Sequence, residues 1–145
     1  MTTLRIRGIA LLIAVTALFA LPTGAQAAVP AESPAATGII GTWVGTYTGY
    51  VDGRYVSGDE KIVITNAREH AAKGTWQSKS SGNKWSKALP LQLIVTANDD
   101  GSVAIRGADG EGIYDGELMS DGRMVFVYSD PQPDLIVLRL ELARQ

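Results

Sequence analysis

The stretch G-T-W-V-G-T-Y-T-G-Y, residues 41–50, decides the fold, because its residues alternate in kind with a period of two. One register carries glycines and large aromatic residues: Gly41, Trp43, Gly45, Tyr47 and Gly49. The other register carries mainly threonine. A period of two is the repeat of a β-strand, and alternating small and large residues suit the inward face of a small barrel. We therefore predict that Gly41–Val51 is the first strand of a β-barrel, with Trp43 and Tyr47 directed inward.

The first 27 residues have the pattern of a secretory signal peptide. Arg5 and Arg7 precede an apolar run of 13 residues, Ile9–Leu21, and Ala25-Gln26-Ala27 provides a small-x-small cleavage site. The run is shorter than the roughly 20 residues that a membrane-spanning helix needs. We expect residues 1–27 to be removed, leaving a secreted or periplasmic protein with no transmembrane segment in the mature chain. An uncleaved anchor is the alternative.

Composition narrows the class of protein further. Residues 28–37 are rich in alanine and proline and are expected to form a flexible leader, so that residues 38–145 form the barrel domain. The absence of cysteine excludes disulfides, thiolate metal sites and cysteine nucleophiles. Without Arg5 and Arg7, 11 basic residues are interspersed with 15 acidic ones. No basic stripe is present, so a nucleic-acid partner is not expected.

Short alternating segments continue through the domain, and turn residues separate them. Asp-Gly pairs, which supply the positive φ angles of tight hairpins, begin at residues 52, 100, 109 and 121. The predicted strands are Gly41–Val51, Glu60–Asn66, Gly74–Ser78, Leu89–Ala97, Ser102–Gly107, Gly112–Leu118, Arg123–Tyr128 and Leu135–Leu142. Short strands joined by tight turns predict an all-β fold, an eight-stranded antiparallel up-and-down β-barrel. A β-sandwich and a half-open barrel are the alternatives.

Two segments depart from this simple pattern. Asn66–Lys73 begins with a candidate helix cap, with Glu69 three residues later, so one or two helical turns or a loop are expected there. Asp115-Gly116 lies inside a predicted strand. A glycine at such a position predicts either a β-bulge or the close approach of a neighbouring backbone.

The predicted first strand begins with Gly41-Thr42-Trp43, which resembles the Gly-x-Trp signature of the calycin-type barrels: lipocalins, fatty-acid-binding proteins and avidins. The longer Gly-x-Trp-x-Gly pattern is similar to the start of the nitrobindin-like haem barrels. The resemblance implies that Trp43 closes one end of the barrel. It also implies that Arg139 or Arg144, from the end of the last strand, packs across Trp43 in a cation–π contact of about 0.5–2 kcal/mol. Gly41, Trp43 and Arg139 are thus the expected structural residues.

The resemblance implies the barrel but no particular ligand. The Thr-Asp-x-x-Tyr segment of lipocalins is absent, and no tryptophan follows Trp85, whereas avidins place biotin-stacking tryptophans late in the chain. His70 is the sole histidine and comes early, whereas nitrobindins carry their haem-ligating histidine late. No cofactor is therefore expected.

Aromatic residues on the inward registers of several strands form the candidate binding surface. We expect the following residues to line the interior: Trp43, Tyr47, Tyr114, Phe126 and Tyr128. They form either a packed core or the wall of a ligand pocket, since an eight-stranded barrel holds one small ligand or none. Our first hypothesis is an exported, non-enzymatic barrel that binds a small apolar or amphipathic ligand.

A barrel enzyme doing proton-transfer chemistry, such as a cyclase, isomerase or hydrolase, is the second hypothesis. Asp115 and Glu117 share one face of a predicted strand and would act with Tyr47 or Tyr114. The opposite register, which contains Tyr114 and two glycines, is the better inward face, so the two carboxylates are expected in solvent. The chain contains no Gly-x-Ser-x-Gly, P-loop or His-Glu-x-x-His motif.

The remaining polar features are expected to be structural or loop-borne. His70 reads as a surface residue, and the acidic segments 98–102 and 108–112 read as hairpin turns rather than calcium loops, so no metal site is expected. The third hypothesis is an interaction or inhibitor barrel whose protein partner is unknown. Its candidate contact is the proline-restricted loop Ser129–Asp134.

Overall fold

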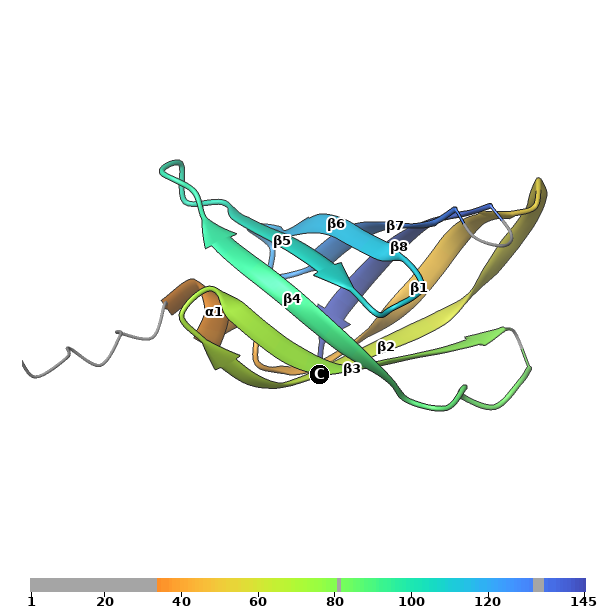
Figure 1. The fold of residues 1–145 in the computed structure, drawn as a ribbon, viewed down its shortest axis with the longest axis horizontal. Helices are drawn as coiled ribbons and strands as arrows, with labels where there is room; N and C mark the ends of the chain where they lie inside the picture. The colour runs from red at the N-terminus through yellow and green to blue at the C-terminus, as the bar shows by residue number, and fades with distance from the viewer. Residues whose placement is uncertain (1–33, 81, 132–134) are drawn as a thin grey trace, which may run out of the picture.

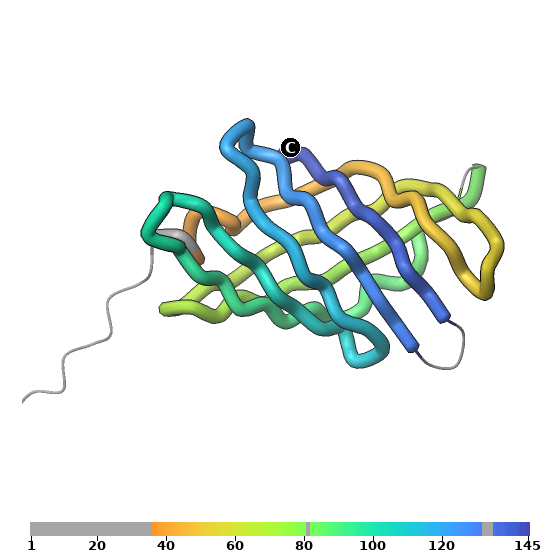
Figure 2. The backbone as a smooth tube through the Cα atoms, turned by 90° about the horizontal axis from the view of Figure 1, so that it is seen from above, coloured from red at the N-terminus to blue at the C-terminus, as the bar shows by residue number. Residues whose placement is uncertain are grey.

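The chain folds into a closed barrel of eight antiparallel strands, in which each strand pairs with its neighbour in sequence and the last pairs with the first. The structure is a computed structural model and describes residues 34–80, 82–131 and 135–145. Figure 1 shows the barrel from the side, with α1 at one end and the β1–β2 hairpin reaching out beyond the other. Figure 2 shows the strands crossing the barrel obliquely, with β1 and β8 side by side where it closes.

The elements follow one another without any crossover. Their bounds are α1 Pro34–Gly38, β1 Gly41–Val51, β2 Arg54–Arg68, β3 Ala71–Ser80, β4 Leu89–Ala97, β5 Val103–Ala108, β6 Ile113–Leu118, β7 Met124–Asp130 and β8 Ile136–Arg144. The predicted all-β up-and-down barrel is therefore confirmed, and the sandwich and half-open alternatives are wrong.

The first hairpin is longer than predicted, because only two residues form its turn and both strands continue up to them. Asp52 and Gly53 have φ angles of 49° and 73°, and the strands pair right up to Val51 and Arg54. Such a turn matches the right-handed twist of the flanking strands. As a result β2 begins at Arg54, six residues before the predicted start, and the alternating inward register is also extended.

The helical turn expected over Asn66–Lys73 is wrong. These residues form the end of β2, a two-residue turn at Glu69 and His70, and the start of β3, with Asn66 paired to Lys73. Glu69 adopts a φ of 54°, as a tight turn requires. The local capping signal is overridden by strand pairing on both sides, and the register shift lies nearby, between Ile64 and Asn66.

Gly116 lies in a regular strand. Of the two predicted explanations for this glycine, the β-bulge is wrong and the close approach of a neighbouring backbone is confirmed. Pairing with β5 and β7 continues through Gly116 without a shift. A Cβ atom there would lie 2.1 Å from the Val125 carbonyl oxygen, and one at Gly45 would lie 1.8 Å from the Glu141 carbonyl oxygen. Glycines on the inward register therefore let neighbouring strands coil closely past one another.

Trp43 fills the end of the barrel that α1 covers. Its side chain is buried, and its Nε1–H donates a 2.9 Å hydrogen bond to the Ile39 carbonyl oxygen. The Arg144 guanidinium lies 5.5 Å from the Trp43 ring centroid and donates to the Ile40 carbonyl oxygen. Arg139 instead lies on the outer face and pairs with Glu141, so Arg144 is the arginine that covers the tryptophan.

Gly41 lies at the same end of the barrel, where its backbone conformation and the nearby Arg144 side chain favour glycine. Its φ of 145° is one that other residues rarely adopt, and a Cβ there would lie 3.0 Å from Arg144 Nε. The glycine of the Gly-x-Trp pattern thus leaves space for the arginine that packs on the tryptophan.

The start of the described chain is packed against this end. α1, Pro34–Gly38, overlaps residues 34–37 of the predicted leader, and Ala36 and Ile39 are fully buried against the barrel. The predicted signal peptide lies outside the described residues. Within the described part of the chain, no helix has the length and apolar character needed to cross a membrane.

Candidate ligand-binding cavity

The barrel interior is packed at the α1 end and hollow toward the other end. The hollow half holds a cavity of about 290 Å³. Its wall comes from β1, β2, β3, β6, β7 and β8 and combines aromatic, aliphatic and a few polar side chains. The lining residues are Tyr47, Val51, Val56, Glu60, Trp76, Ser78, Ser80, Glu111, Tyr114, Tyr128, Ile136, Leu138 and Leu140.

Three of the five aromatic residues predicted to line the interior border this cavity. They are Tyr47, Tyr114 and Tyr128. Trp43 lies at the opposite, closed end. Phe126 lies one layer deeper, where it is fully buried and packs edge-on against Tyr114 with ring centroids 5.9 Å apart. The interior is therefore core in one half and pocket wall in the other.

Glu60 is the one carboxylate in the cavity wall that is nearly inaccessible to solvent, with 2% of its surface exposed. It lies on β2 opposite Gly45 of β1 and Ser78 of β3, two small residues that leave space around it. Its Oε1 atom is buried and has no hydrogen-bond partner among the described residues. Burial, with a smaller contribution from the negative charge of Asp109, raises the pKa of Glu60 to about 8.

Trp76 carries a second unpartnered polar atom in the same wall. Its Nε1 is buried, and the described residues offer it no hydrogen-bond acceptor. Glu60 of β2 pairs with Ser78 of β3, and Ile62, the next inward residue of β2, pairs with Trp76. Trp76 therefore lies one inward position further along the barrel than Glu60. An unsatisfied buried polar group costs about 1–3 kcal/mol, and this wall carries two of them.

Tyr114 is held in place by the turn between β5 and β6. Its hydroxyl donates to Asp109 Oδ2 at 3.2 Å, while Asp109 Oδ1 accepts from the backbone N–H groups of Glu111 and Gly112. The Tyr114 and Tyr128 rings lie 4.7 Å apart. Burial raises the pKa of both tyrosines above the usual value, so both hydroxyls stay protonated.

Gly112 makes room for this tyrosine pair. A Cβ atom at Gly112 would lie 2.5 Å from the Tyr128 ring, which is too close for any side chain. The Asp109-Gly110 turn, the glycine that follows it and the two tyrosines therefore form one preorganised side of the cavity.

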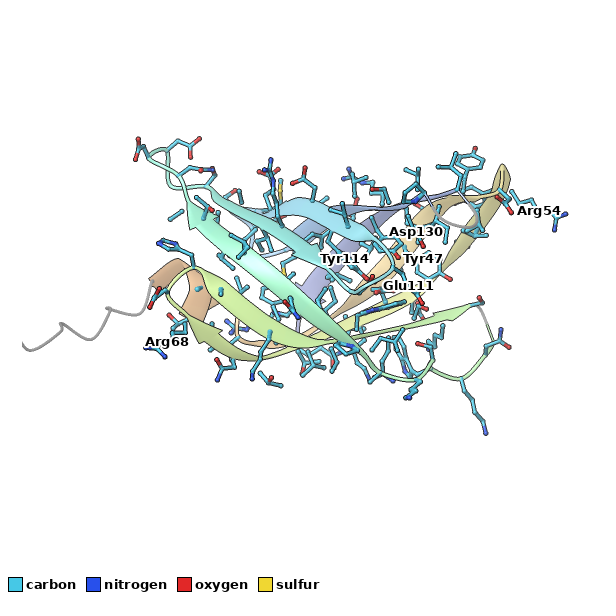
Figure 3. All side chains as sticks on the ribbon, in the orientation of Figure 1. Tyr47, Arg54, Arg68, Glu111, Tyr114 and Asp130 are labelled. Carbon is cyan, nitrogen blue, oxygen red and sulfur yellow. The ribbon has the colours of Figure 1, made fainter. Side chains whose placement is uncertain are left out.

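The charged residues that line the cavity, among those that the structure describes, are acidic. Glu60 and Glu111 line it, Asp109 bonds to Tyr114, and Asp130, only 4% exposed, ends β7 beside them. Figure 3 shows Glu111, Asp130, Tyr47 and Tyr114 gathered at this end. Among the described residues, no lysine or arginine lines the cavity.

Asp115 and Glu117 lie on the outer face of β6, exposed to solvent, as their register predicts. Asp115 pairs with Arg106 there at 3.1 Å. Neither carboxylate reaches the interior, so the enzyme hypothesis in the form that used them is wrong.

The other predicted polar features serve turns or the surface. His70 is exposed, and its backbone carbonyl accepts from the Val95 N–H at 2.7 Å. The Asp100 carboxylate accepts from the backbone and hydroxyl of Ser102, which closes the β4–β5 hairpin. The loop Ser129–Asp134 falls partly outside the described residues.

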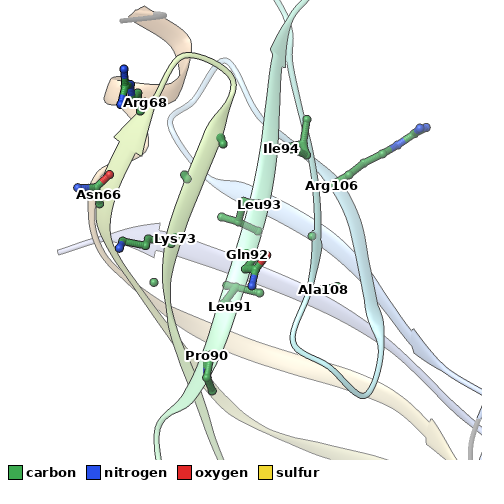
Figure 4. Close-up of a pocket in the computed structure, with 14 residues that line it drawn as sticks. Asn66, Arg68, Lys73, Pro90, Leu91, Gln92, Leu93, Ile94, Arg106 and Ala108 are labelled. Carbon is green, nitrogen blue, oxygen red and sulfur yellow. The ribbon is translucent and has the colours of Figure 1, made fainter.

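A larger hollow of about 770 Å³ lies on the outer wall over β3, β4 and β5 (Figure 4). The side chains at its edges are exposed, and three of them are basic: Arg68, Lys73 and Arg106. It is wide open to solvent, and the two residues that carry unpartnered buried polar atoms, Glu60 and Trp76, line the interior cavity instead. The interior cavity is therefore the better candidate site.

Glu60 was not predicted as a site residue, because the predicted second strand begins at Glu60, whereas β2 begins at Arg54. The signal was present, since Val56, Gly58, Glu60, Ile62 and Ile64 form one alternating register. Four apolar or small neighbours on that register place the carboxylate inside the barrel.

Comparison with known proteins adds no family to this description. No protein-family model matches the chain, and no curated protein matches it either.

Proposed function

We propose that this protein binds a small amphipathic ligand in the hollow half of its barrel. The observation that carries the proposal is a cavity with an apolar and aromatic wall in which two buried polar atoms, Glu60 Oε1 and Trp76 Nε1, have no described partner. Its volume of about 290 Å³ is just below the roughly 300–1,000 Å³ typical of pockets for drug-sized ligands, which fits a small ligand. An apolar ligand body with one polar end fits this wall.

The resemblance of Gly41-Thr42-Trp43 to the calycin signature supports the same function, since those barrels carry ligands in their interiors. The Arg144–Trp43 contact at the closed end is the arrangement that the resemblance implies. The predicted signal peptide supports a secreted or periplasmic binding protein.

Tryptophan fluorescence tests the proposal directly. Trp76 borders the cavity, whereas Trp43 is at the closed end and Trp85 lies outside against Lys61 and Lys79. Titration with an apolar probe and a panel of short amphiphiles should change the emission of the wild type. The change should disappear in Trp76→Phe. Unchanged emission with every compound, and no displacement of the probe, would reject the proposal.

A matched pair of variants locates the site. Leu138 lines the cavity, whereas Val137, its neighbour on β8, is exposed on the outer face. Leu138→Trp should fill the cavity and abolish probe binding, and Val137→Trp should leave binding unchanged. Equal effects of the two substitutions would mean that the probe binds elsewhere.

Proton-transfer catalysis is a second candidate function, now with Glu60 in place of Asp115 and Glu117. A general acid or base works best when its pKa lies near the working pH, and burial raises the pKa of Glu60 to about 8. Tyr114 lines the same cavity. Mass spectrometry of ligands recovered after incubation distinguishes the two functions. A binding protein returns them unchanged, whereas an enzyme returns a product that Glu60→Gln fails to make.

A further inference from the structure

We propose that the polar end of the ligand is a protonated amine with an oxygen acceptor beside it, and that the amine forms an ion pair with Glu60 inside the barrel. The inference rests on the proposed function, because it names the chemical class of ligand for the same cavity. It follows from three independent features: the unpartnered atoms, the sign of the surrounding charge and the aromatic wall.

The unpartnered atoms set the hydrogen-bonding pattern. Glu60 Oε1 and Trp76 Nε1 have no hydrogen-bond partner among the described residues, and both belong to side chains that line one cavity. An ammonium group donates to the carboxylate, and a hydroxyl or ether oxygen one or two bonds away accepts from the indole. Such a ligand satisfies both atoms, whereas an amine alone or an alcohol alone satisfies them less completely.

The charge of the cavity selects a cation over an anion. Glu60, Asp109, Glu111 and Asp130 surround the hollow end, and no described lysine or arginine borders it. A fatty acid or another carboxylate would bring a further negative charge to these acidic residues, and no lysine or arginine among the described lining residues would attract it. A cation would be attracted by the same groups.

The aromatic wall supports the same choice. Tyr47, Tyr114, Tyr128 and Trp76 present rings to the cavity. Ring faces attract ammonium groups, and the attraction is stronger when water is excluded. Four aromatic rings and the carboxyl groups of Glu60 and Glu111 around a small hollow form a site suited to an organic cation.

Binding changes the proton on Glu60. Burial keeps the carboxyl protonated in the empty cavity near neutral pH, whereas a bound ammonium favours the carboxylate. The carboxyl O–H proton therefore passes to the buffer when the amine binds, and the amine keeps all of its own protons. The other titratable groups that face Glu60 are Tyr47 from β1, Tyr114 from β6, Tyr128 and Asp130 from β7, and Asp109 and Glu111 from the β5–β6 turn.

The test compares four probes that share one alkyl chain: octylammonium, octanol, octanoate and 2-aminooctan-1-ol. Calorimetry with wild-type protein should give the order 2-aminooctan-1-ol, octylammonium, octanol and octanoate, from tightest to weakest. In Glu60→Gln the two amines should lose about ten- to hundredfold in affinity, as expected for a hydrogen bond to a charged group, while octanol changes little. Trp76→Phe should remove the advantage of 2-aminooctan-1-ol over octylammonium.

Proton release gives a readout that does not depend on any variant. At a pH of about 7, octylammonium binding measured in buffers of different ionisation enthalpy should release close to one proton. Its affinity should rise up to about tenfold for each pH unit until the pH passes the pKa of Glu60, since a primary amine stays protonated to about pH 10.

The outcomes separate this inference from the function on which it rests. If none of the four probes binds, the proposed function fails. If octanol or octanoate binds as tightly as octylammonium, or no proton is released, the amine is wrong while ligand binding stands. If 2-aminooctan-1-ol and octylammonium bind equally, the oxygen acceptor is wrong.

Discussion

Glu60→Gln tests whether a carboxyl group is buried beside the cavity, because it removes the ionisation and keeps the size of the side chain. Folding raises the pKa of Glu60 from 4.5 to about 8, chiefly through burial. At about 1.4 kcal/mol for each pH unit, that rise corresponds to roughly 5 kcal/mol of folding free energy. Folded domains are stable by only about 5–15 kcal/mol, so the effect is large on this scale.

The sign follows from the direction of the pKa change. The folded state holds this proton more tightly than the unfolded state. The stabilisation is therefore complete below pH 4.5 and is lost as the pH rises through about 8. Relative to Glu60→Gln, the free energy of unfolding of the wild type should fall by up to about 5 kcal/mol across this window and level off above it.

Urea unfolding followed by circular dichroism, from about pH 5 to about pH 9, measures this difference. Glu117→Gln is the matched control, because Glu117 is exposed on the outer face of β6 and its removal should leave the pH dependence of the wild type intact. If wild type and Glu60→Gln follow parallel curves, Glu60 is solvated and the reasoning about the cavity fails.

Two further predictions concern the frame of the barrel, and urea unfolding checks both. Gly45→Ala should destabilise the protein by about 1–3 kcal/mol or more, because the alanine Cβ would lie 1.8 Å from the Glu141 carbonyl oxygen. Unchanged stability would mean that β1 and β8 do not approach each other so closely. Arg144→Ala should cost about 0.5–1 kcal/mol through its lost contact with Trp43, whereas Arg139→Ala, on the outer face, should stay within about 0.5 kcal/mol of wild type. The reverse ranking would show that the other arginine covers the tryptophan.

The strand register was predictable because it depends only on residues that are close together in the sequence. Gly41–Val51 and Leu89–Ala97 match the predicted strands at both ends, since a period of two and Asp-Gly turns need no knowledge of distant residues. Asn66–Lys73 was not predictable in the same way, because its capping signal competes with strand pairing, and the partners of Ala71–Lys73 on β4, Gln92–Ile94, lie about twenty residues further along the chain.

The candidate site was only partly predictable for a related reason. The inward register identified Tyr47, Tyr114 and Tyr128, but nothing in the order of residues shows where the core stops and the cavity begins. Glu60 was not predicted because the expected second strand began at that residue, which left out the inward register from Val56 onward, and because charged residues are rarely buried without a partner. A functional site is where such local expectations are most often violated.

The most direct test of a buried, ligand-binding Glu60 is the pH titration of its carboxyl carbon by NMR, with the resonance assigned by its loss in Glu60→Gln. The account predicts a pKa near 8 in the free protein, and a clear fall when octylammonium is added. A pKa close to the ordinary 4.3 of a solvated glutamate, unchanged by octylammonium, would contradict it.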